Sequence, residues 1–372
     1  MSAMYSPRPA AARRLLAVSF VILLLPTAGH LSWRSHFPEA APATTVNDIR
    51  GCLNGTASLP QIQARVGFLI PTFTLTPYVN FNHSFYAFYM KYHWAQGYIT
   101  KDLEWLKTHV TAKWSPRELN DEKPLSDFLT SRTASDCGLV LGTDLRMTDD
   151  IAVDNGALFA GGARQFDVLI LGHEEYVTRN EYDQLRQFVA SGGRVVEMSG
   201  NTFWGEVNYS RTTQIETFVA GHGFQFDGSR AWATPFEPFD SESAGWFGST
   251  FAVGVWGLRG AGLQTSGEFG AAVAQGIHGS LAFTDYAYPH DEVNYLRNMT
   301  GTDVVAKFYT SAYAKGGSEH FVLPFLPVDS YIHRYRLGEV VCLCVFGENI
   351  IKTDLGAQFF LVYAVREGFA SR

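Results

Sequence analysis

Two groups of polar residues in the middle of the chain could carry out chemistry. His173, Glu175 and Tyr176 come directly after the apolar run 168–171, and Ser199 follows a second apolar run. A histidine next to a carboxylate can move protons, and carboxylate and phenolate oxygens can bind a metal ion. The pattern therefore predicts a polar site at the ends of two strands.

The segment between these two groups has the pattern of a helix. Thr178 is placed to cap it, Tyr182, Leu185 and Phe188 recur at helical spacing, and a Ser-Gly-Gly sequence ends it. Continuous apolar runs are typical of strands buried on both faces, and a crossover helix joins parallel strands. We therefore expect both polar groups at one edge of the sheet, where open α/β sheets bind ligands.

Two stretches of this region carry a family resemblance, FDVLILGHEEY at 166–176 and FVASGGRVVEMSGNTFW at 188–204. They resemble a strand ending in G-H-x-E-Y, and a helix, double glycine and strand ending in S-G-N, of the C-terminal domain of the large (beta) subunit of N,N-dimethylformamidase and its relatives. Residues 66–78, 138–145 and 338–365 are similar more loosely. The resemblance implies an α/β fold of the class I glutamine amidotransferase-like type, with a doubly wound, mostly parallel sheet. Glycines, aromatic residues and short apolar runs at 221–279 predict an irregular, β-containing insertion.

The resemblance also implies an amidase mechanism, in which iron held by tyrosines and a glutamate polarises an amide carbonyl for attack by water. Tyr176 matches the tyrosine of the G-H-x-E-Y pattern, and Glu242, followed by a glycine and a tryptophan, matches the glutamate. The second tyrosine has no match in the aligned position, so Tyr78, beyond the first strand, is its spatial candidate. His173 and Glu175 would act as bases or orient the ligands. The leading hypothesis is an exported, metal-assisted hydrolase of a small amide.

A serine hydrolase is one alternative. The amidotransferase-like fold places a nucleophilic cysteine on the turn where this chain has Ser199. A serine there needs a histidine to activate it, and His290 with Glu292 follows in the chain order of such a triad. Ser-Gly is also a common tight turn, and we favour that structural role over a working triad.

The other alternative is a non-catalytic protein that binds a glycan or a peptide. Asn201 and Trp204 are candidate substrate-binding residues, and Trp232, Trp246 and Trp256 could line an aromatic crevice with Trp204. The absence of the cysteine and of the second tyrosine from the aligned positions favours this hypothesis. Each candidate residue also has an ordinary role in a turn or at the edge of the core, so it is their clustering that favours a site.

Composition and the N-terminal sequence limit the partners and the location. The net charge of −7, without a basic block, argues against nucleic acid as a partner. Arginines, the apolar run 15–25 and small residues predict that residues 1–30 are a secretory signal peptide or an uncleaved membrane anchor. The protein is then secreted or membrane-anchored. Export would agree with N-x-S/T sequons, which signal glycosylation, at Asn54, Asn82, Asn208 and Asn298.

We predict one folded domain at residues 66–368, after a linker at 31–65 and with an insertion at about 210–300. The cysteines leave two possibilities open: a single bridge, such as Cys52 to one of the C-terminal pair Cys342 and Cys344, or buried free thiols. The close pair is not expected to bond to itself, because alternate residues of one strand point to the same face. A small partner subunit or a homo-oligomer is also possible.

Overall fold

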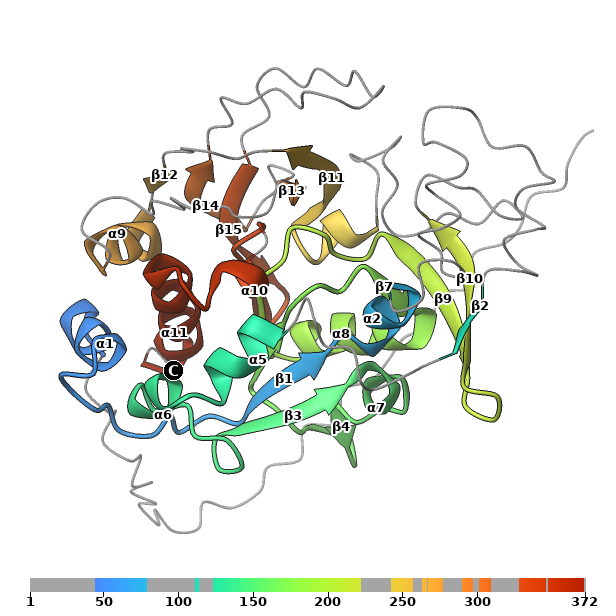
Figure 1. Ribbon diagram of the computed structural model, residues 1–372, viewed down its shortest axis with the longest axis horizontal. Helices are drawn as coiled ribbons and strands as arrows, with labels where there is room; N and C mark the ends of the chain where they lie inside the picture. Colours follow the sequence, from blue (N-terminus) through green and yellow to red (C-terminus); the bar gives the residue numbers. More distant parts are fainter. Residues whose placement is uncertain are drawn as a thin grey trace, which may run out of the picture. The chain divides into compact units, whose positions relative to one another are not determined.

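The computed structural model describes residues 44–78, 111–113, 123–221, 242–256, 263–265, 267–276, 290–296, 301–308, 328–345 and 347–370. These residues belong to one compact unit that begins at Ala41 (Figure 1). The predicted signal or anchor at 1–30 lies outside the described residues. Within the described part of the chain, no helix is long and apolar enough to cross a membrane.

An eight-stranded sheet forms the centre of this unit. Five neighbouring strands are parallel, in the order β3 (Leu145–Asp149), β1 (Val66–Ile70), β6 (Val168–Leu171), β8 (Arg194–Glu197) and β16 (Gly338–Cys342). Three antiparallel strands extend the sheet beyond β16, namely β15 (Val328–Tyr335), β14 (Thr302–Phe308) and β12 (Leu263–Thr265). Ranked by position in the chain, the parallel strands have the order 2-1-3-4-5, which is one of the doubly wound arrangements. The predicted α/β fold with a mostly parallel sheet is confirmed.

Helices cover both faces of the sheet, which explains why its central strands are continuously apolar. Phe68 and Ile170 enter one core, whereas their neighbours Leu69 and Leu171 enter the other. The first core is covered by α1 (Val46–Leu53), α5 (Lys123–Leu129), α6 (Arg132–Asp136), α9 (Gly267–Gly276), α10 (Gly347–Ile350) and α11 (Leu355–Ala370). The second core is covered by α7 (Asp150–Asp154) and α8 (Arg179–Ala190).

Smaller strand groups lie beside the main sheet. A four-stranded sheet has the order β2 (Thr111–Lys113), β10 (Ile215–Gly221), β9 (Gly205–Ser210) and β7 (Tyr176–Thr178). An antiparallel pair consists of β11 (Ser249–Trp256) and β13 (His290–Leu296), and a short hairpin of β4 (Phe159–Ala160) and β5 (Ala163–Arg164). β10, β11 and β13 fall within the predicted insertion, whose limits stay a prediction.

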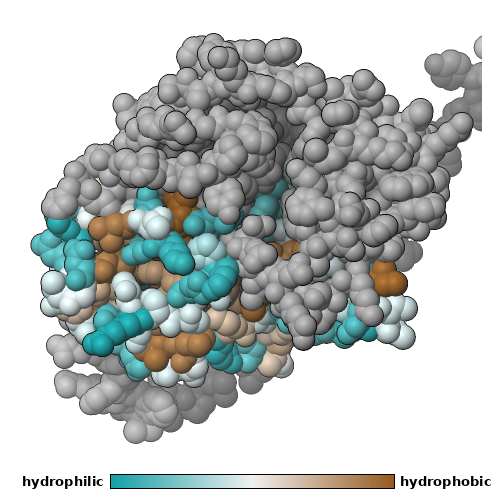
Figure 2. Space-filling model, viewed as in Figure 1, coloured by the Kyte–Doolittle hydropathy of each residue, from teal (hydrophilic) through white to brown (hydrophobic). Residues whose placement is uncertain are grey.

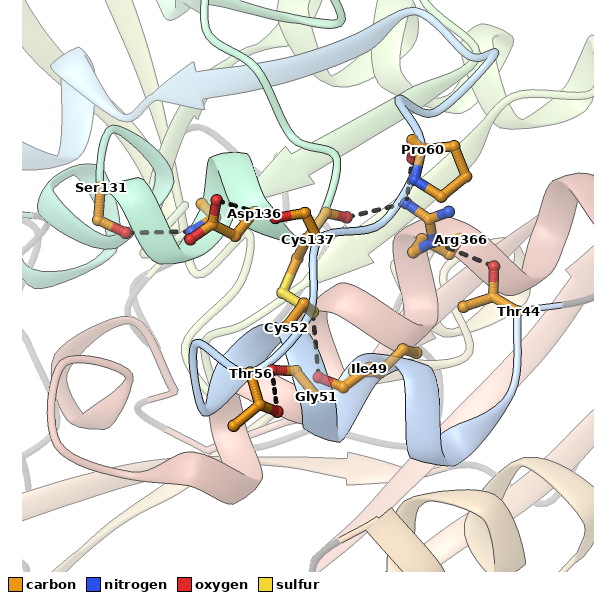
Figure 3. Close-up of a disulfide and its surroundings, with 12 residues drawn as sticks. Thr44, Ile49, Gly51, Cys52, Thr56, Pro60, Ser131, Asp136, Cys137 and Arg366 are labelled. Carbon is orange, nitrogen blue, oxygen red and sulfur yellow. Dashed lines mark hydrogen bonds between the residues drawn. A yellow bond between two sulfur atoms is a disulfide. The ribbon is translucent and has the colours of Figure 1, made fainter.

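Helix α1 belongs to the folded unit, although the sequence predicted a linker there. Its Cys52 forms a disulfide with Cys137, which follows α6 (Figure 3). Arg366 of α11 donates hydrogen bonds to the carbonyl oxygen of Cys137 at 2.8 Å and to that of Pro60 at 3.1 Å. The Thr45 side chain caps α1 through a reciprocal hydrogen bond with Asp48, and the buried face of α1 packs into the first core. Residues 46–53 are therefore folded, which corrects this part of the predicted linker.

The cysteine pairing also differs from the prediction. The structure contains the disulfides Cys52–Cys137 and Cys342–Cys344, so neither a bridge from Cys52 to the C-terminal pair nor free thiols is correct. The close pair was misjudged because β16 ends at Cys342, and Cys344 adopts a left-handed backbone with φ of 67°. The two side chains do not alternate along one strand.

Apolar and hydrophilic residues are interspersed over the described part of the face shown in Figure 2. Among the described residues, the large apolar side chains that are exposed are Leu141, Met147, Leu337 and Leu355. Exposed apolar residues of this kind are ordinary on protein surfaces and do not by themselves indicate a docking surface.

We expect the two disulfides to differ in their effect on stability. Cys137→Ala opens a link across 85 residues, whereas Cys344→Ala opens a link across 2 residues, and a disulfide restricts the unfolded chain more when its loop is long. The first substitution should lower the free energy of unfolding by about 2–5 kcal/mol. Denaturant unfolding of both variants tests this, with Cys344→Ala as the matched control; equal losses would contradict it.

His333 should make the protein less stable as the pH falls below neutrality. It is buried on β15, its Nδ1 lies 2.7 Å from the Thr302 hydroxyl, and burial lowers its pKa from the ordinary 6.5. The unfolded chain then binds the proton more readily than the folded chain. The free energy of unfolding therefore decreases as the pH falls below 6.5, the pKa of an ordinary histidine. The fall in Tm between pH 7.5 and 5.5 should be smaller in His333→Gln than in the natural protein. An unchanged slope would show that His333 does not contribute.

Candidate functional site

The strand order reverses between β1 and β6, and doubly wound sheets form their ligand crevice at such a point. Helix α2 (Thr72–Tyr78) follows β1, and the segment 172–175 connects β6 to β7. Helix α2 and the start of β7 are joined where the backbone N–H of Tyr176 donates to the Thr74 hydroxyl at 3.0 Å. The sequence correctly placed the polar group after β6 at this edge.

His173 and Glu175 form the pair that the sequence singled out for proton transfer. The His173 Nε2 lies 3.5 Å from a carboxylate oxygen of Glu175, and both residues are buried. The backbone of the segment is fixed on its other side, because Phe203 N–H donates to the Glu174 carbonyl and Gly205 N–H to the Glu175 carbonyl. A buried carboxylate beside an imidazole is an arrangement suited to general acid and base chemistry.

Tyr176, the predicted phenolate ligand, is packed into the wall of the site. Its side chain is 1% exposed, and its ring meets that of Phe218 edge to face at a centroid distance of 5.9 Å. The ring also lies against β9 at Gly205, where a Cβ atom would stand 2.6 Å from the Tyr176 Cδ1. The ring position therefore depends on a glycine at position 205.

Glu242, the predicted carboxylate ligand, lies on the surface beside α8. Its carboxylate contacts Arg186 at 2.5 Å and Arg179 at 3.5 Å, and these are its described polar contacts. Two guanidinium groups already neutralise it, which leaves it poorly suited to a cation. Tyr78 is the last residue of α2, and its side chain lies outside the described residues. Glu242, as its contacts are described, thus does not fit the role of an iron ligand, and the iron site that the resemblance implies stays a prediction.

Ser199 has the contacts of a turn residue. Its N–H donates to a Glu197 carboxylate oxygen at 2.7 Å, and its hydroxyl accepts from Asn201 N–H at 3.2 Å. A nucleophile elbow joins a strand to a helix, but β8 leads through a loop to strand β9. No described histidine is hydrogen-bonded to Ser199. His290 begins β13, opposite Trp256, and its side chain lies outside the described residues. These features favour the structural role.

The candidate substrate-binding residues are buried. Asn201 is 0% exposed and Trp204 is 2% exposed. Trp246, the third aromatic candidate, is also buried, and its Nε1–H donates to the Tyr182 hydroxyl at 2.7 Å. Trp232 and the side chain of Trp256 lie outside the described residues. Two of the four tryptophans therefore belong to the core and not to an open crevice.

The structure gathers three carboxylates that the sequence analysis did not bring together. One oxygen from each of Asp150, Glu174 and Glu181 lies within 4.8 Å of the other two, and all three residues are 0% exposed. Asp150 also accepts a hydrogen bond from the Phe73 N–H at 2.6 Å. Burial, and next the Asp150 charge, raise the pKa of Glu181 well above its ordinary value. The sequence did not point to Glu181, because a glutamate three residues after Thr178 is typical of a helix cap. The cap is indeed present, since the Glu181 N–H donates to the Thr178 hydroxyl.

Residues 49–283, more than half of the chain, match the family described as N,N-dimethylformamidase beta subunit-like, C-terminal. The chain belongs to this family. The matched residues include the His173 and Glu175 pair, Tyr176 and the three clustered carboxylates. The resemblance recognised from the G-H-x-E-Y and S-G-N patterns is confirmed.

Comparisons outside the family are weaker. No curated protein matches the chain. Among solved structures, a putative ThuA-like protein from Bacteroides uniformis has 15% identity and a TM-score of 0.41, over 67% of this chain and 84% of that one. A β-galactosidase from Bacillus circulans sp. alkalophilus has 13% identity and a TM-score of 0.35, over 60% of this chain and 24% of that one. An exo-β-1,4-mannosidase from Opitutaceae bacterium strain TAV5 has 10% identity and a TM-score of 0.34, over 83% and 35%.

We expect Gly205→Ala to disturb the site. The new methyl group would lie 2.6 Å from the Tyr176 ring and 2.9 Å from the Phe218 ring, so one ring must move. Forcing an extra carbon into a packed core typically costs about 1–3 kcal/mol, which denaturant unfolding would detect. Gly245→Ala is the matched control, because its added carbon has no atom within 4 Å. A Gly205→Ala protein as stable as the control would contradict the packing described.

Proposed function

We propose that this family member is an amidase-like hydrolase that cleaves the carbon–nitrogen bond of a small amide. Membership of the N,N-dimethylformamidase-like family supports the reaction class. The observation that carries the proposal is the His173 and Glu175 pair, 3.5 Å apart, on the loop that follows β6 at the point where the strand order reverses. Ligands of doubly wound sheets bind at this point.

The pair can supply the proton transfers that amide hydrolysis requires. A water molecule attacks the carbonyl carbon while the His173 imidazole accepts one of its protons, and the Glu175 carboxylate stabilises the imidazolium that forms. The imidazolium then returns the proton to the amide nitrogen, the carbon–nitrogen bond breaks, and a carboxylic acid and an amine are released. Atoms and charge balance with one water consumed for each bond cleaved. No step is assigned to iron, because Glu242 is neutralised by Arg179 and Arg186.

Export belongs to the same proposal. The arginines and the apolar run near the N-terminus support it, and so do the two disulfides, because such bonds persist in oxidising compartments. The glycan or peptide-binding alternative is less well supported, since Trp204 and Trp246 are buried.

Release of amine from simple amides, among them N,N-dimethylformamide, tests the activity. We expect His173→Gln to reduce kcat by about 10²–10⁴-fold, because a positioned acid and base contributes about that much. Glu175→Gln should reduce kcat as well, with the pH profile displaced. His333→Gln is the matched control, since it removes another buried histidine from a different part of the sheet.

Two outcomes would count against the proposal. Amine release that is undetectable over a panel of formamides, acetamides and primary amides would reject the reaction class. Activity that survives His173→Gln at the level of the His333→Gln control would reject the role of His173 and keep the reaction class open.

A further inference from the structure

Four buried carboxylates from separate elements face one region at the edge of the sheet. Asp150 begins α7 directly after β3, Glu174 follows β6, and Glu181 lies in the first turn of α8. Glu216 is contributed by β10 of the smaller sheet. All four are 0% exposed. The helices involved also contact each other, α2 with α7 and α7 with α8, as they are grouped in Figure 1.

The spacing of the first three carboxylates suits a single cation. Their oxygens lie within 4.8 Å of one another. Calcium binds oxygen ligands at about 2.3–2.6 Å, so two ligands on opposite sides of the ion are about 4.6–5.2 Å apart. Magnesium requires shorter distances, about 2.0–2.1 Å. Oxygens no more than 4.8 Å apart fall within the span of calcium ligands, so these three can surround one ion of that size.

Glu216 is an independent observation that points to the same place. It occupies an inward position of β10, where buried residues alternate with partly exposed ones, between the partly exposed Ile215 and Thr217. Neither of its carboxylate oxygens has a hydrogen-bond partner among the residues that the structure describes. Burial raises its pKa well above the ordinary value, and the charge of Asp150 raises it further, which places the two carboxylates in one electrostatic environment.

Among the described residues, no lysine, arginine or histidine forms an ion pair with Glu181 or Glu216. A buried carboxylate must either hold a proton or lie next to a cation, because an isolated buried charge costs several kcal/mol or more. Carboxylate oxygens are also the ligands that hard divalent cations prefer.

We propose that Asp150, Glu174 and Glu181 bind one divalent, oxygen-preferring cation of about the size of calcium, with the Glu216 carboxylate beside it. The ion would join the ends of β3 and β6 to the start of α8, and so hold together the edge that carries His173 and Glu175. Its ligands are different residues from Tyr176, Glu242 and Tyr78, and the proposal does not depend on the proposed amidase activity.

The test measures ion binding and stability instead of hydrolysis. Protein stripped with a chelator is titrated with CaCl2, MgCl2 or MnCl2 by calorimetry, and Tm is recorded with each ion. We expect one ion bound per chain and a higher Tm, with calcium or manganese binding more tightly than magnesium. Glu181→Gln should weaken binding at least about 10-fold, since even residues that only support a metal ligand contribute that much.

The order of Tm between Glu181→Gln and the natural protein, with and without calcium, distinguishes a bound ion from carboxylates that only share a proton. In chelator, Glu181→Gln should melt higher than the natural protein, because it removes a buried acid that must take up a proton when no cation is present; with calcium the order should reverse. Glu348→Gln is the matched control, since Glu348 is also 0% exposed but lies on α10, and it should keep the ion and the natural order. Absence of any bound ion, or equal binding by the Glu181→Gln and Glu348→Gln proteins, would overturn the proposal.

Discussion

The parallel pairing of β1 with β6 is the interaction on which the rest of the molecule depends. Val66 lies beside Val168 and Phe68 beside Ile170, and the strand order reverses at this pair. Alternate residues of both strands enter opposite cores, so a shift by one residue would move every buried side chain to the wrong face. The same pairing sets the ends of the two strands side by side. Helix α2 and the segment 172–175 meet there, and the candidate site exists only because they do.

That edge concentrates negative charge in a place that water does not reach, and the structure compensates for it in two different ways. Glu175 has the imidazole of His173 at 3.5 Å, which can carry a proton to or from it. Glu181 and Glu216 have no ion pair with a described cation, so protons or a bound ion must neutralise them. The edge is thus divided into a part suited to proton transfer and a part suited to a hard cation, although both are built from the same residue types.

Local patterns explain which of these features the sequence could predict. The strand at 168–171 and the helix after Thr178 were predictable because burial on both faces, and one apolar face with a cap, leave clear signatures. Strand β3 has no such signature in the sequence. It lies at the end of the sheet, its residues Arg146 and Met147 are exposed, and its sequence is largely polar. Asp150 follows that strand, so its position could not be located. Glu216 and the Cys52–Cys137 bond depend on contacts between distant parts of the chain, which periodicity does not encode.

The geometry of α8 shows why Glu242 and the buried carboxylates around Glu181 cannot bind the same ion. Successive residues of a helix are rotated by about 100°, so Arg179 and Arg186, seven positions apart, point in nearly the same direction. Both hold Glu242 at the surface. Glu181 is rotated by about 200° from Arg179 and is directed to the buried side instead. The body of the helix therefore separates the carboxylate that the family resemblance selects from the carboxylates that the fold brings together. An ion in the buried cluster would act on the loop after β6 through Glu174, whereas the described contacts of Glu242 are with Arg179 and Arg186 on α8.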